Sequence, residues 1–204
     1  MSQKRLMRRI NLGLKRFFDI IVSAAGLLIL SPVFLLTVLL IKITMPGKIF
    51  FQQERVGKGK KVFHILKFRT MKEDRQAEEA HDFSKDAERM TTTGNILRRL
   101  KIDELPQLWN VFAGDMSLVG PRPTVMEQVE QYDEFQLRRL GMRPGMTGLA
   151  QVNGNVSLSW NERIKYDVRY IEKFSVVLDL AIMIKTVLVV IFGEQKFKKE
   201  CGWE

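Results

Sequence analysis

The chain has 204 residues, 46% of them hydrophobic and 27% charged, with a formal net charge of +10. This length can build one sizeable core and a membrane element, but it leaves little room for two full catalytic domains. The charge indicates a polyanionic neighbour, either nucleic acid or an anionic lipid surface. The single cysteine, Cys201, excludes an intramolecular disulfide framework, and the two histidines, His64 and His81, lack the spacing of a zinc site.

An uncharged stretch of apolar and small residues covers residues 20–41 and is long enough to cross a bilayer, for which roughly 20 residues are needed. Ser31 and Pro32 lie in its middle, where proline bends or breaks a helix. Both flanks are basic, so the positive-inside rule favours the cytoplasm for both ends. A plain spanning anchor is the alternative, but these features favour a helix-break-helix hairpin that enters the membrane and returns to the same face. Asp19 would be costly in lipid, so we expect it to pair with a neighbouring Arg or Lys at headgroup level.

Two apolar runs on either side of a Gly-Lys-Gly-Lys turn at residues 57–60 predict a β-hairpin over residues 48–71. Near its end, Lys67 and Arg69 alternate around Phe68, so they share a face of the strand that could contact a phosphate or the membrane. A basic surface strand is an equally good interpretation of this pattern. Residues 72–90 are polar without apolar periodicity, which predicts a mobile loop or an exposed helix without chemistry.

Adjacent acidic residues, Asp103 and Glu104, lie between two predicted helices. A helical spacing of apolar residues begins at Asn95, and a second helical run has Pro106 in its first turn. The acidic pair therefore lies at or just before a helix N-terminus, where the dipole favours anions and free N–H groups can bind phosphate. A solvated helix face is the alternative for such a pair.

Cations surround the acidic pair along the chain. Three precede it, and Arg122 follows in a loop between Pro121 and Pro123 that cannot be helical. Such a mixture suits a phosphorylated substrate, because cations hold the phosphate and a carboxylate meets it directly or through a metal. The three preceding cations are Arg98, Arg99 and Lys101.

The last third of the chain predicts an amphipathic helix over residues 125–140 that ends at Gly141, and then a glycine-rich loop that is not a P-loop. A helix begins near Trp160. Residues 176–192 are strongly apolar but contain Asp179 and Lys185, which indicates an interfacial or core-packed helix rather than a second span. The fold class expected from these elements is α+β and mostly helical. It combines a re-entrant membrane hairpin in residues 1–46 with a small membrane-associated catalytic domain in residues 47–204, which carries interfacial helices and a short β-hairpin.

Several long motifs occur in one order along nearly the whole chain. They are Arg16-Phe17-Phe18-Asp19, Ser31-Pro32, Lys67-Phe68-Arg69-Thr70-Met71, Asp103-Glu104-Leu105-Pro106-Gln107-Leu108, Gly114-Asp115-Met116-Ser117-Leu118-Val119-Gly120-Pro121-Arg122-Pro123 and Arg143-Pro144-Gly145-Met146-Thr147-Gly148-Leu149-Ala150-Gln151-Val152-Asn153-Gly154. With these motifs the chain resembles the small monotopic phosphoglycosyl transferases, the bacterial sugar transferases that start glycoconjugate synthesis on undecaprenyl phosphate.

The resemblance implies a double displacement. Asp103 attacks the β-phosphate of a UDP-sugar, forms a phosphosugar-aspartyl intermediate and releases UMP, and undecaprenyl phosphate then attacks the intermediate. Glu104 is the partner carboxylate, and Mg²⁺ is held near Asp103. Asp167 and Asp179 match acidic positions that support the site. The candidate substrate-binding residues are Lys67, Arg69, Arg98, Pro121, Arg122, Pro123 and Gln151.

The resemblance also implies a location on the cytosolic face of the bacterial cytoplasmic membrane, in contact with its lipids, and it leaves a homodimer open. One departure from the family pattern is Asn155, where the family often has Arg, so the choice of sugar is the least determined property. The pathway, whether capsule, exopolysaccharide, O-antigen or glycoprotein, is open as well.

Two other functions compete with this interpretation. A basic membrane-anchored protein that binds nucleic acid or lipid without chemistry would fit the charge, but no aromatic-interleaved nucleic-acid surface is present, so we expect no nucleic-acid partner. A Mg²⁺-dependent phosphatase or pyrophosphatase acting on lipid phosphates would use similar residues. Its product separates it, since hydrolysis yields free phosphate and transfer yields UMP and a lipid diphosphate sugar.

Overall fold

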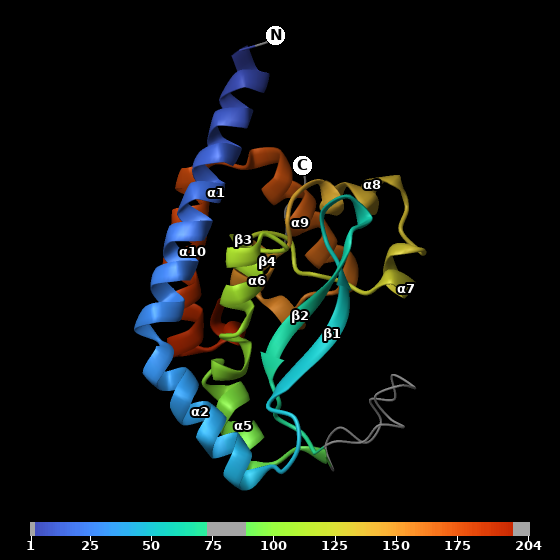
Figure 1. The fold of residues 1–204 in the computed structure, drawn as a ribbon. Helices are drawn as coiled ribbons and strands as arrows, with labels where there is room; N and C mark the ends of the chain where they lie inside the picture. The colour runs from blue at the N-terminus through green and yellow to red at the C-terminus, as the bar shows by residue number, and fades with distance from the viewer. Residues whose placement is uncertain (1–2, 73–88, 198–204) are drawn as a thin grey trace.

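The computed structural model describes residues 3–72 and 89–197. Its strands are β1 (Phe50–Val56), β2 (Val62–Phe68), β3 (Ser117–Val119) and β4 (Gly145–Thr147). Its α-helices are α1 (Gln3–Ile29), α2 (Ser31–Thr44), α5 (Thr92–Arg99), α6 (Gln107–Ala113), α7 (Met126–Val129), α8 (Glu134–Leu137), α9 (Trp160–Lys173) and α10 (Val176–Phe192). Its 3-10 turns are η1 (Lys58–Lys60), η2 (Ile102–Glu104), η3 (Arg138–Gly141), η4 (Gln151–Asn153), η5 (Asn155–Ser157) and η6 (Glu194–Phe197). The predicted mostly helical α+β character is confirmed (Figure 1).

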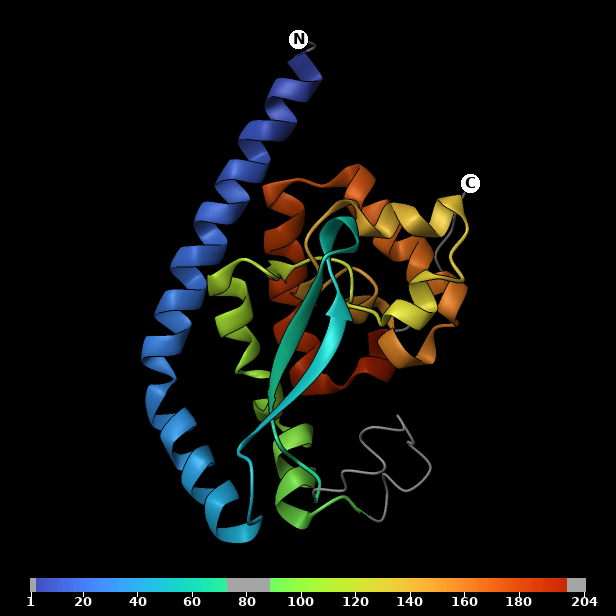
Figure 2. The same ribbon diagram turned by 45° about the vertical axis from the view of Figure 1, so that its right-hand side comes forward.

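Helices α1 and α2 form one bent arm along the outside of the molecule, and the N-terminal end of α1 extends beyond the rest of the protein (Figure 2). The chain breaks at Leu30, and Ser31-Pro32 opens α2, so proline lies in the first turn, where no helical hydrogen bond needs its missing N–H. The described helices include none that could cross a membrane by itself. The residues Leu6–Ile29 and Ser31–Thr44 reach the necessary length and apolar composition only together, across a bend of 58°.

The predicted hairpin is confirmed by the antiparallel pairing of β1 with β2, which crosses the centre of the molecule (Figure 1). Its register pairs Phe51 with Lys67 and Arg55 with Phe63. Because side chains alternate along a strand, Arg55 and Lys67 lie on one face of the hairpin. The loop or helix predicted for residues 72–90 falls mostly on residues 73–88, which lie outside the described residues.

The acidic pair lies in η2, directly before α6, as predicted. The hydroxyl of Thr91 caps α5 by accepting from a backbone N–H. Lys101 adopts the left-handed conformation with φ of 57°, which turns the chain sharply from α5 into η2. Pro106 caps α6. These turns bring Asp103 and Glu104 together under the hairpin.

A second, parallel sheet was not predicted from the sequence. Strands β3 and β4 pair through Ser117 with Gly145 and Val119 with Thr147. A methyl group on Gly145 would lie 2.1 Å from the backbone nitrogen of Gly120, so only glycine permits this close approach. The pairing positions the segment that begins at residue 121.

The prediction of one helix over residues 125–140 is wrong. The segment divides into α7, α8 and η3. Asp133 starts α8 with a capping box: its carboxylate accepts from the backbone N–H of Gln136, and the Gln136 side chain accepts from the Asp133 N–H. A residue that caps a new helix cannot continue the previous one.

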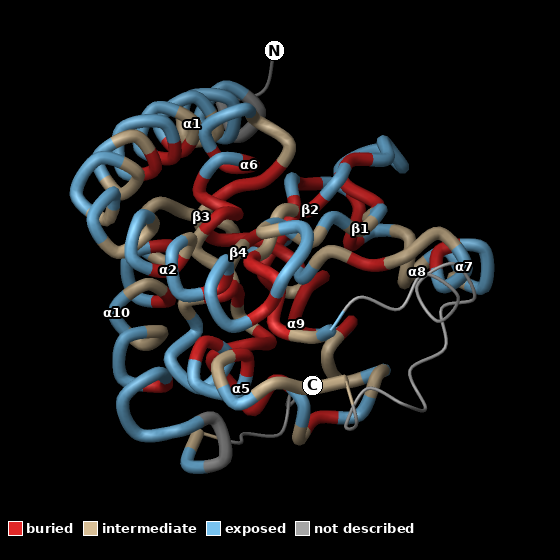
Figure 3. The backbone as a smooth tube through the Cα atoms, turned by 60° about the horizontal axis from the view of Figure 1, so that its bottom comes forward, coloured by how far each residue is buried: buried red, intermediate tan, exposed pale blue. Residues whose placement is uncertain are grey.

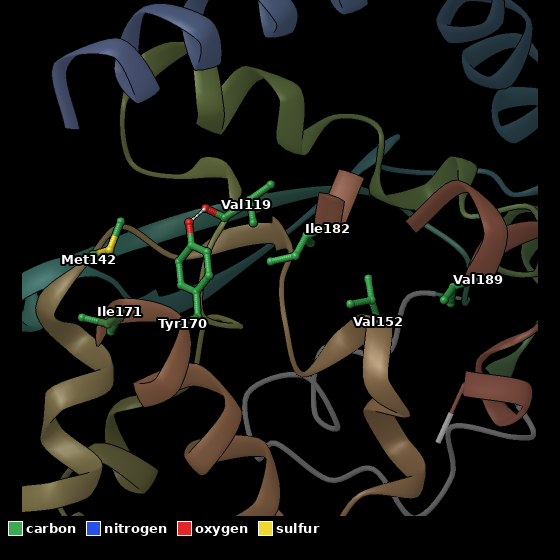
Figure 4. Packing of buried hydrophobic residues seen from close by; sticks show 7 residues of the cluster. All are labelled: Val119, Met142, Val152, Tyr170, Ile171, Ile182 and Val189. Atoms are coloured by element: carbon green, nitrogen blue, oxygen red, sulfur yellow. Dashed lines mark hydrogen bonds between the residues drawn. The ribbon is translucent and has the colours of Figure 1, made fainter. Parts of the chain in front are cut away.

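Helices α9 and α10 form as predicted and enclose the main core (Figure 4). A capping box of Ser159 and Glu162 starts α9. The hydroxyl oxygen of Tyr170 lies 3.2 Å from the carbonyl of Val119, so α9 contacts β3. The buried side chains of this core are Val119, Met142, Val152, Tyr170, Ile171, Ile182 and Val189.

The outer faces of α1, α2 and α10 lie on the same side of the molecule and are exposed (Figure 3). Much of this surface is apolar, and patches of this kind mark contacts with proteins or membranes. Among its most exposed members are Leu28, Ile29, Leu36, Ile43, Val177 and Ile184.

Polar contacts fasten α1 to the rest of the protein. The ammonium of Lys15 lies 2.6 Å from Asp179 on α10, and both side chains are buried. The ion pair expected for Asp19 at headgroup level is corrected by the structure. Asp19 is buried and faces β3, where its Oδ1 accepts from the hydroxyl of Ser117 and the N–H of Leu118, both at 3.0 Å.

Candidate active site

Asp103 and Glu104 line a cleft of about 610 Å³. Its walls come from β1 and the end of β2, from residues of α5 and η2, and from residues 125–127. The cleft therefore lies between the hairpin and the acidic turn, and it is large enough for a ligand the size of a nucleotide sugar.

Asp103 is 7% exposed, and its Oδ1 has no hydrogen-bond partner among the described residues. Burial raises the pKa of this carboxyl group, and the charge of Glu104 adds to the rise, whereas Lys67, Arg98 and Lys101 oppose it. Asp103 lines the cleft, and a buried carboxylate oxygen with no protein partner is available to a ligand, a cation or an electrophile.

Glu104 is held in a different way. Its Oε1 lies 2.7 Å from the ammonium of Lys67. Burial alone would raise the pKa of Glu104, but the charge and hydrogen bond of Lys67, with Arg122 and Lys101, outweigh burial and lower it. The two adjacent carboxylates therefore have different roles, because one is paired and ionised and the other is unpartnered.

The predicted basic residues surround this cleft but make different contacts. Arg98 donates from Nε to the hydroxyl of Thr70 at 3.0 Å and lines the cleft. Arg69 also lines it, but Nη2 donates to the carbonyls of Met45 and Pro46, the latter at 3.0 Å, so Arg69 ties the end of α2 to the end of β2.

A smaller pocket of about 40 Å³ adjoins the cleft and holds the other candidates. Its lining includes Arg122, Pro123 and Gln151, while the carbonyl of the buried Pro121 accepts from the N–H of Gly145 at 2.8 Å. Arg122 is exposed. Gln151 is buried, and neither of its amide atoms has a described partner.

Comparison with known proteins decides the family. Residues 10–193 match the family model described as bacterial sugar transferase. The chain belongs to the bacterial sugar transferase family. It is a sugar phosphotransferase, so the prediction of an enzyme of this family is confirmed.

Three relatives illustrate the similarity. The sugar transferase is 41% identical over 181 residues to the uncharacterized sugar transferase EpsL of Bacillus subtilis, with 89% of each chain covered. It is 39% identical over 188 residues to the exopolysaccharide production protein ExoY of Rhizobium meliloti, covering 85% of this chain and 83% of that one. It is also 42% identical over 187 residues to the UDP-N-acetylgalactosamine-undecaprenyl-phosphate N-acetylgalactosaminephosphotransferase of Aeromonas hydrophila, covering 88% of this chain but only 44% of that longer protein.

The two aspartates expected to support the site line neither cavity of the sugar transferase. Asp167 is 1% exposed and pairs with Arg139 at 2.5 Å, and burial raises its pKa to about 6 against the opposing charge of Arg139. The same guanidinium donates to the carbonyl of Arg122 at 3.0 Å. Asp179 accepts from Lys15 and from the hydroxyl of Tyr170. Both aspartates hold the segments behind the site.

Arg55, which was not predicted as a site residue, lines the cleft and the small pocket. The pairing of the two strands places Arg55 on the same face of the hairpin as Lys67, and the sequence alone does not give this register. Asn155, the departure from the family pattern, is buried with φ of 43°, and asparagine is among the residues that adopt this conformation most readily.

The residues present fit a magnesium ion only as a site completed by substrate. The described residues contain no cluster of three or more His, Cys, Asp or Glu side chains suited to a metal. Mg²⁺ is, however, commonly held by one or two carboxylates together with substrate phosphates. The carboxylate of Asp103, which lines the cleft, offers one such ligand.

Proposed function

We propose that this sugar transferase moves a sugar 1-phosphate from a UDP-sugar to undecaprenyl phosphate, releasing UMP and forming undecaprenyl-diphosphate-sugar. The names of several relatives support this choice of donor and acceptor, among them an undecaprenyl-phosphate galactose phosphotransferase of Salmonella typhimurium and a UDP-glucose:undecaprenyl-phosphate glucose-1-phosphate transferase of Klebsiella pneumoniae. The observation that carries the proposal is the buried, unpartnered Oδ1 of Asp103 in a cleft lined by cations.

In the first half-reaction, Oδ1 of Asp103 attacks the β-phosphorus. The bond from that phosphorus to the bridging oxygen breaks, and UMP leaves with the electron pair. Lys67 neutralises Glu104 by pairing with it, so the second carboxylate repels the incoming diphosphate less. Arg98 lines the same cleft and offers N–H donors to phosphate oxygens.

In the second half-reaction, an oxygen of the lipid phosphate attacks the phosphorus of the phosphosugar-aspartyl intermediate. Asp103 leaves as a carboxylate, so the enzyme returns to its starting state without a net proton transfer. A buried carboxylate suits both steps, because few water molecules compete with the lipid for the intermediate.

We propose Asp103 and the substrate phosphates as the ligands of Mg²⁺. When bound, the ion supplies charge screening at the phosphates. The protein chain orients the nucleophile, because η2 and the tight turn at Lys101 fix the position of Asp103.

We further propose that α1 and α2 form the re-entrant membrane hairpin of residues 1–46, and that residues 47–204 lie on the cytosolic face of the bacterial cytoplasmic membrane. The break at Ser31-Pro32, the 58° bend and the exposed apolar faces of α1, α2 and α10 support this arrangement. A site held at the surface can receive a soluble nucleotide sugar and a lipid phosphate from opposite sides.

The test uses purified full-length protein, UDP-sugar labelled in the sugar phosphate, and Mg²⁺, without lipid. We expect release of UMP and a labelled adduct that peptide mapping places on Asp103. Asp103→Asn should give neither product, because the amide is a poor nucleophile. Asp115→Asn is the matched control, since Asp115 is only partly buried and lines neither cavity.

Adding undecaprenyl phosphate should then move the label from the protein to the lipid. Wild-type protein that forms labelled lipid without any adduct would replace the double displacement by direct attack of the lipid. Release of free phosphate from lipid phosphates, with no labelled lipid, would favour the phosphatase alternative.

A further inference from the structure

Arg55 occupies the junction of the two cavities. Of the residues that the structure describes, three line both cavities, namely Arg55, Lys67 and Glu104. Lys67 and Glu104 pair with each other, whereas the hydrogen bond of Arg55 goes to the neutral Oε1 of Gln53, at 2.5 Å. Among the described residues, Arg55 is therefore the cation at this junction that has no carboxylate within ion-pair distance.

A second guanidinium faces the same space. Arg122 lines the small pocket, and its charge lowers the pKa of Arg55, second only to burial, while Glu127 opposes the shift. Two like charges brought together at a partly buried site repel each other unless an anion lies between them. Strand β1 holds Arg55 and the segment after β3 holds Arg122 beside the small pocket. This pair of guanidinium groups is suited to an anionic ligand.

The unpaired amide of Gln151 is a second indication of a ligand, and it does not depend on charge. It is 8% exposed, lines the small pocket, and has a buried amide nitrogen and oxygen without described partners. A buried amide left unpaired costs free energy that a ligand in the pocket would recover. The volume of about 40 Å³ accommodates a few oxygen atoms rather than a sugar or a base.

The position of Asp103 decides which phosphate enters the pocket. Asp103 lines the cleft but not the small pocket, so the phosphorus that it attacks lies in the cleft. The two phosphates of a nucleoside diphosphate share one bridging oxygen and must lie side by side. We infer that Arg55, together with Arg122 and Gln151, binds the α-phosphate of the donor, the phosphate that departs as UMP. This inference rests on the proposed function.

The same residues would assist bond cleavage. When the bridging oxygen leaves the β-phosphorus, its electron pair stays on the α-phosphate, whose charge rises from one to two negative charges. Two guanidinium groups stabilise this developing charge without any proton transfer. Arg55 is then a catalytic residue of the first half-reaction alone, because UMP has left before the lipid attacks.

The experiment compares binding of UMP and of uridine to wild-type protein, Arg55→Gln and the control Lys58→Gln, which removes an exposed charge from the turn of the same hairpin. We expect Arg55→Gln to weaken UMP binding about tenfold or more, to leave uridine binding unchanged, and Lys58→Gln to change neither. Arg55→Lys, which keeps the charge but loses the planar fork, should fall between them. Melting temperatures show whether each variant is folded, and Arg55→Lys serves if Arg55→Gln is not.

Half-reactions separate this inference from the proposed function. Arg55→Gln should slow adduct formation from UDP-sugar, but transfer from a preformed adduct to undecaprenyl phosphate should proceed at the wild-type rate. UMP affinity equal to wild type in both Arg55 variants would overturn the inference, and so would equal slowing of both half-reactions, which would assign the pocket to the lipid phosphate. Failure of wild-type protein to bind UMP at all would instead contradict the proposed function.

Discussion

Gly94 lies where α5 passes over the end of β2, and the space there has no room for a side chain. A methyl group built on Gly94 would lie 1.8 Å from the carbonyl oxygen of Thr70 and 2.9 Å from its Cα. These are backbone atoms, so no rotation of a side chain relieves the overlap. Gly94→Ala must therefore separate α5 from β2 by about 1.2 Å to bring the methyl to 3.0 Å from the oxygen.

This displacement would reach the cleft directly. Arg98 on the same helix donates to the hydroxyl of Thr70, and the chain runs from α5 through Lys101 to Asp103. A shift of about 1 Å in a catalytic group costs about 10²-fold in rate. The overpacking should cost about 1–3 kcal/mol of stability, partly offset by about 0.5–1 kcal/mol from replacing a helical glycine. We therefore expect activity to suffer more than stability.

The assay is transfer of labelled sugar phosphate to undecaprenyl phosphate, compared through kcat/KM, together with the melting temperature. Gly13→Ala is the matched control, because a methyl group there meets no atom within 4 Å. We expect Gly94→Ala to lose about 10²-fold relative to this control. A kcat/KM within about twofold of Gly13→Ala would refute the argument that α5 sets the position of the catalytic turn.

Three further outcomes follow from described contacts. Lys67→Met removes a positive charge that lowers the pKa of Asp103. Because Asp103 must lose its proton to attack, the acid limb of the pH–rate profile for UMP release should move to higher pH. A pH profile identical to that of wild type would contradict this. Arg139→Met leaves Asp167 buried without its partner, which should cost about 3–5 kcal/mol of stability, or about 6–20 °C in melting temperature. Arg139→Met combined with Asp167→Leu should recover most of the loss. An unchanged melting temperature in the single variant would argue against a stabilising role for the pair. Pro32→Leu should straighten the arm and place part of the population across the membrane, read by labelling single cysteines at positions 3 and 47 in intact cells, and periplasmic labelling of the wild-type hairpin would exclude the re-entrant arrangement.

The elements that could be predicted from the sequence are those whose signals are local. The hairpin has glycines in its turn at positions 57 and 59, between two strands of alternating side chains. The acidic pair is followed by Pro106, which marks the start of the next helix. The break at Ser31-Pro32 likewise follows from the chemistry of proline.

The elements that were missed depend on contacts between distant segments. The three-residue strands β3 and β4 exist because Gly120 and Gly145 allow their backbones to meet, and neither strand has a pattern of its own. The partners of Asp19 lie almost a hundred residues away. The single helix predicted over residues 125–140 is wrong for a local reason. Asp133 and Gln136 form a capping box that starts a new helix, although the apolar periodicity continues through this point.

The candidate site shows the same division. Asp103, Glu104 and Arg98 could be selected from the charges around one turn, and all three line the cleft. Arg55 could be assigned to the site only with the strand register and the position of the Arg122 segment in hand.

Two neighbouring cations at the end of the hairpin connect the bent arm of α1 and α2 to the acidic turn. Lys67 holds Glu104, and two residues later Arg69 holds the carbonyls of Met45 and Pro46, where α2 ends. Because α1 is fastened to Asp179 and to β3, a straight arm of α1 and α2 could not keep those contacts and also the contact between Arg69 and the end of α2. The bend at Ser31-Pro32 is therefore a condition for assembling the candidate site, because both ends of the arm must hold the domain at once.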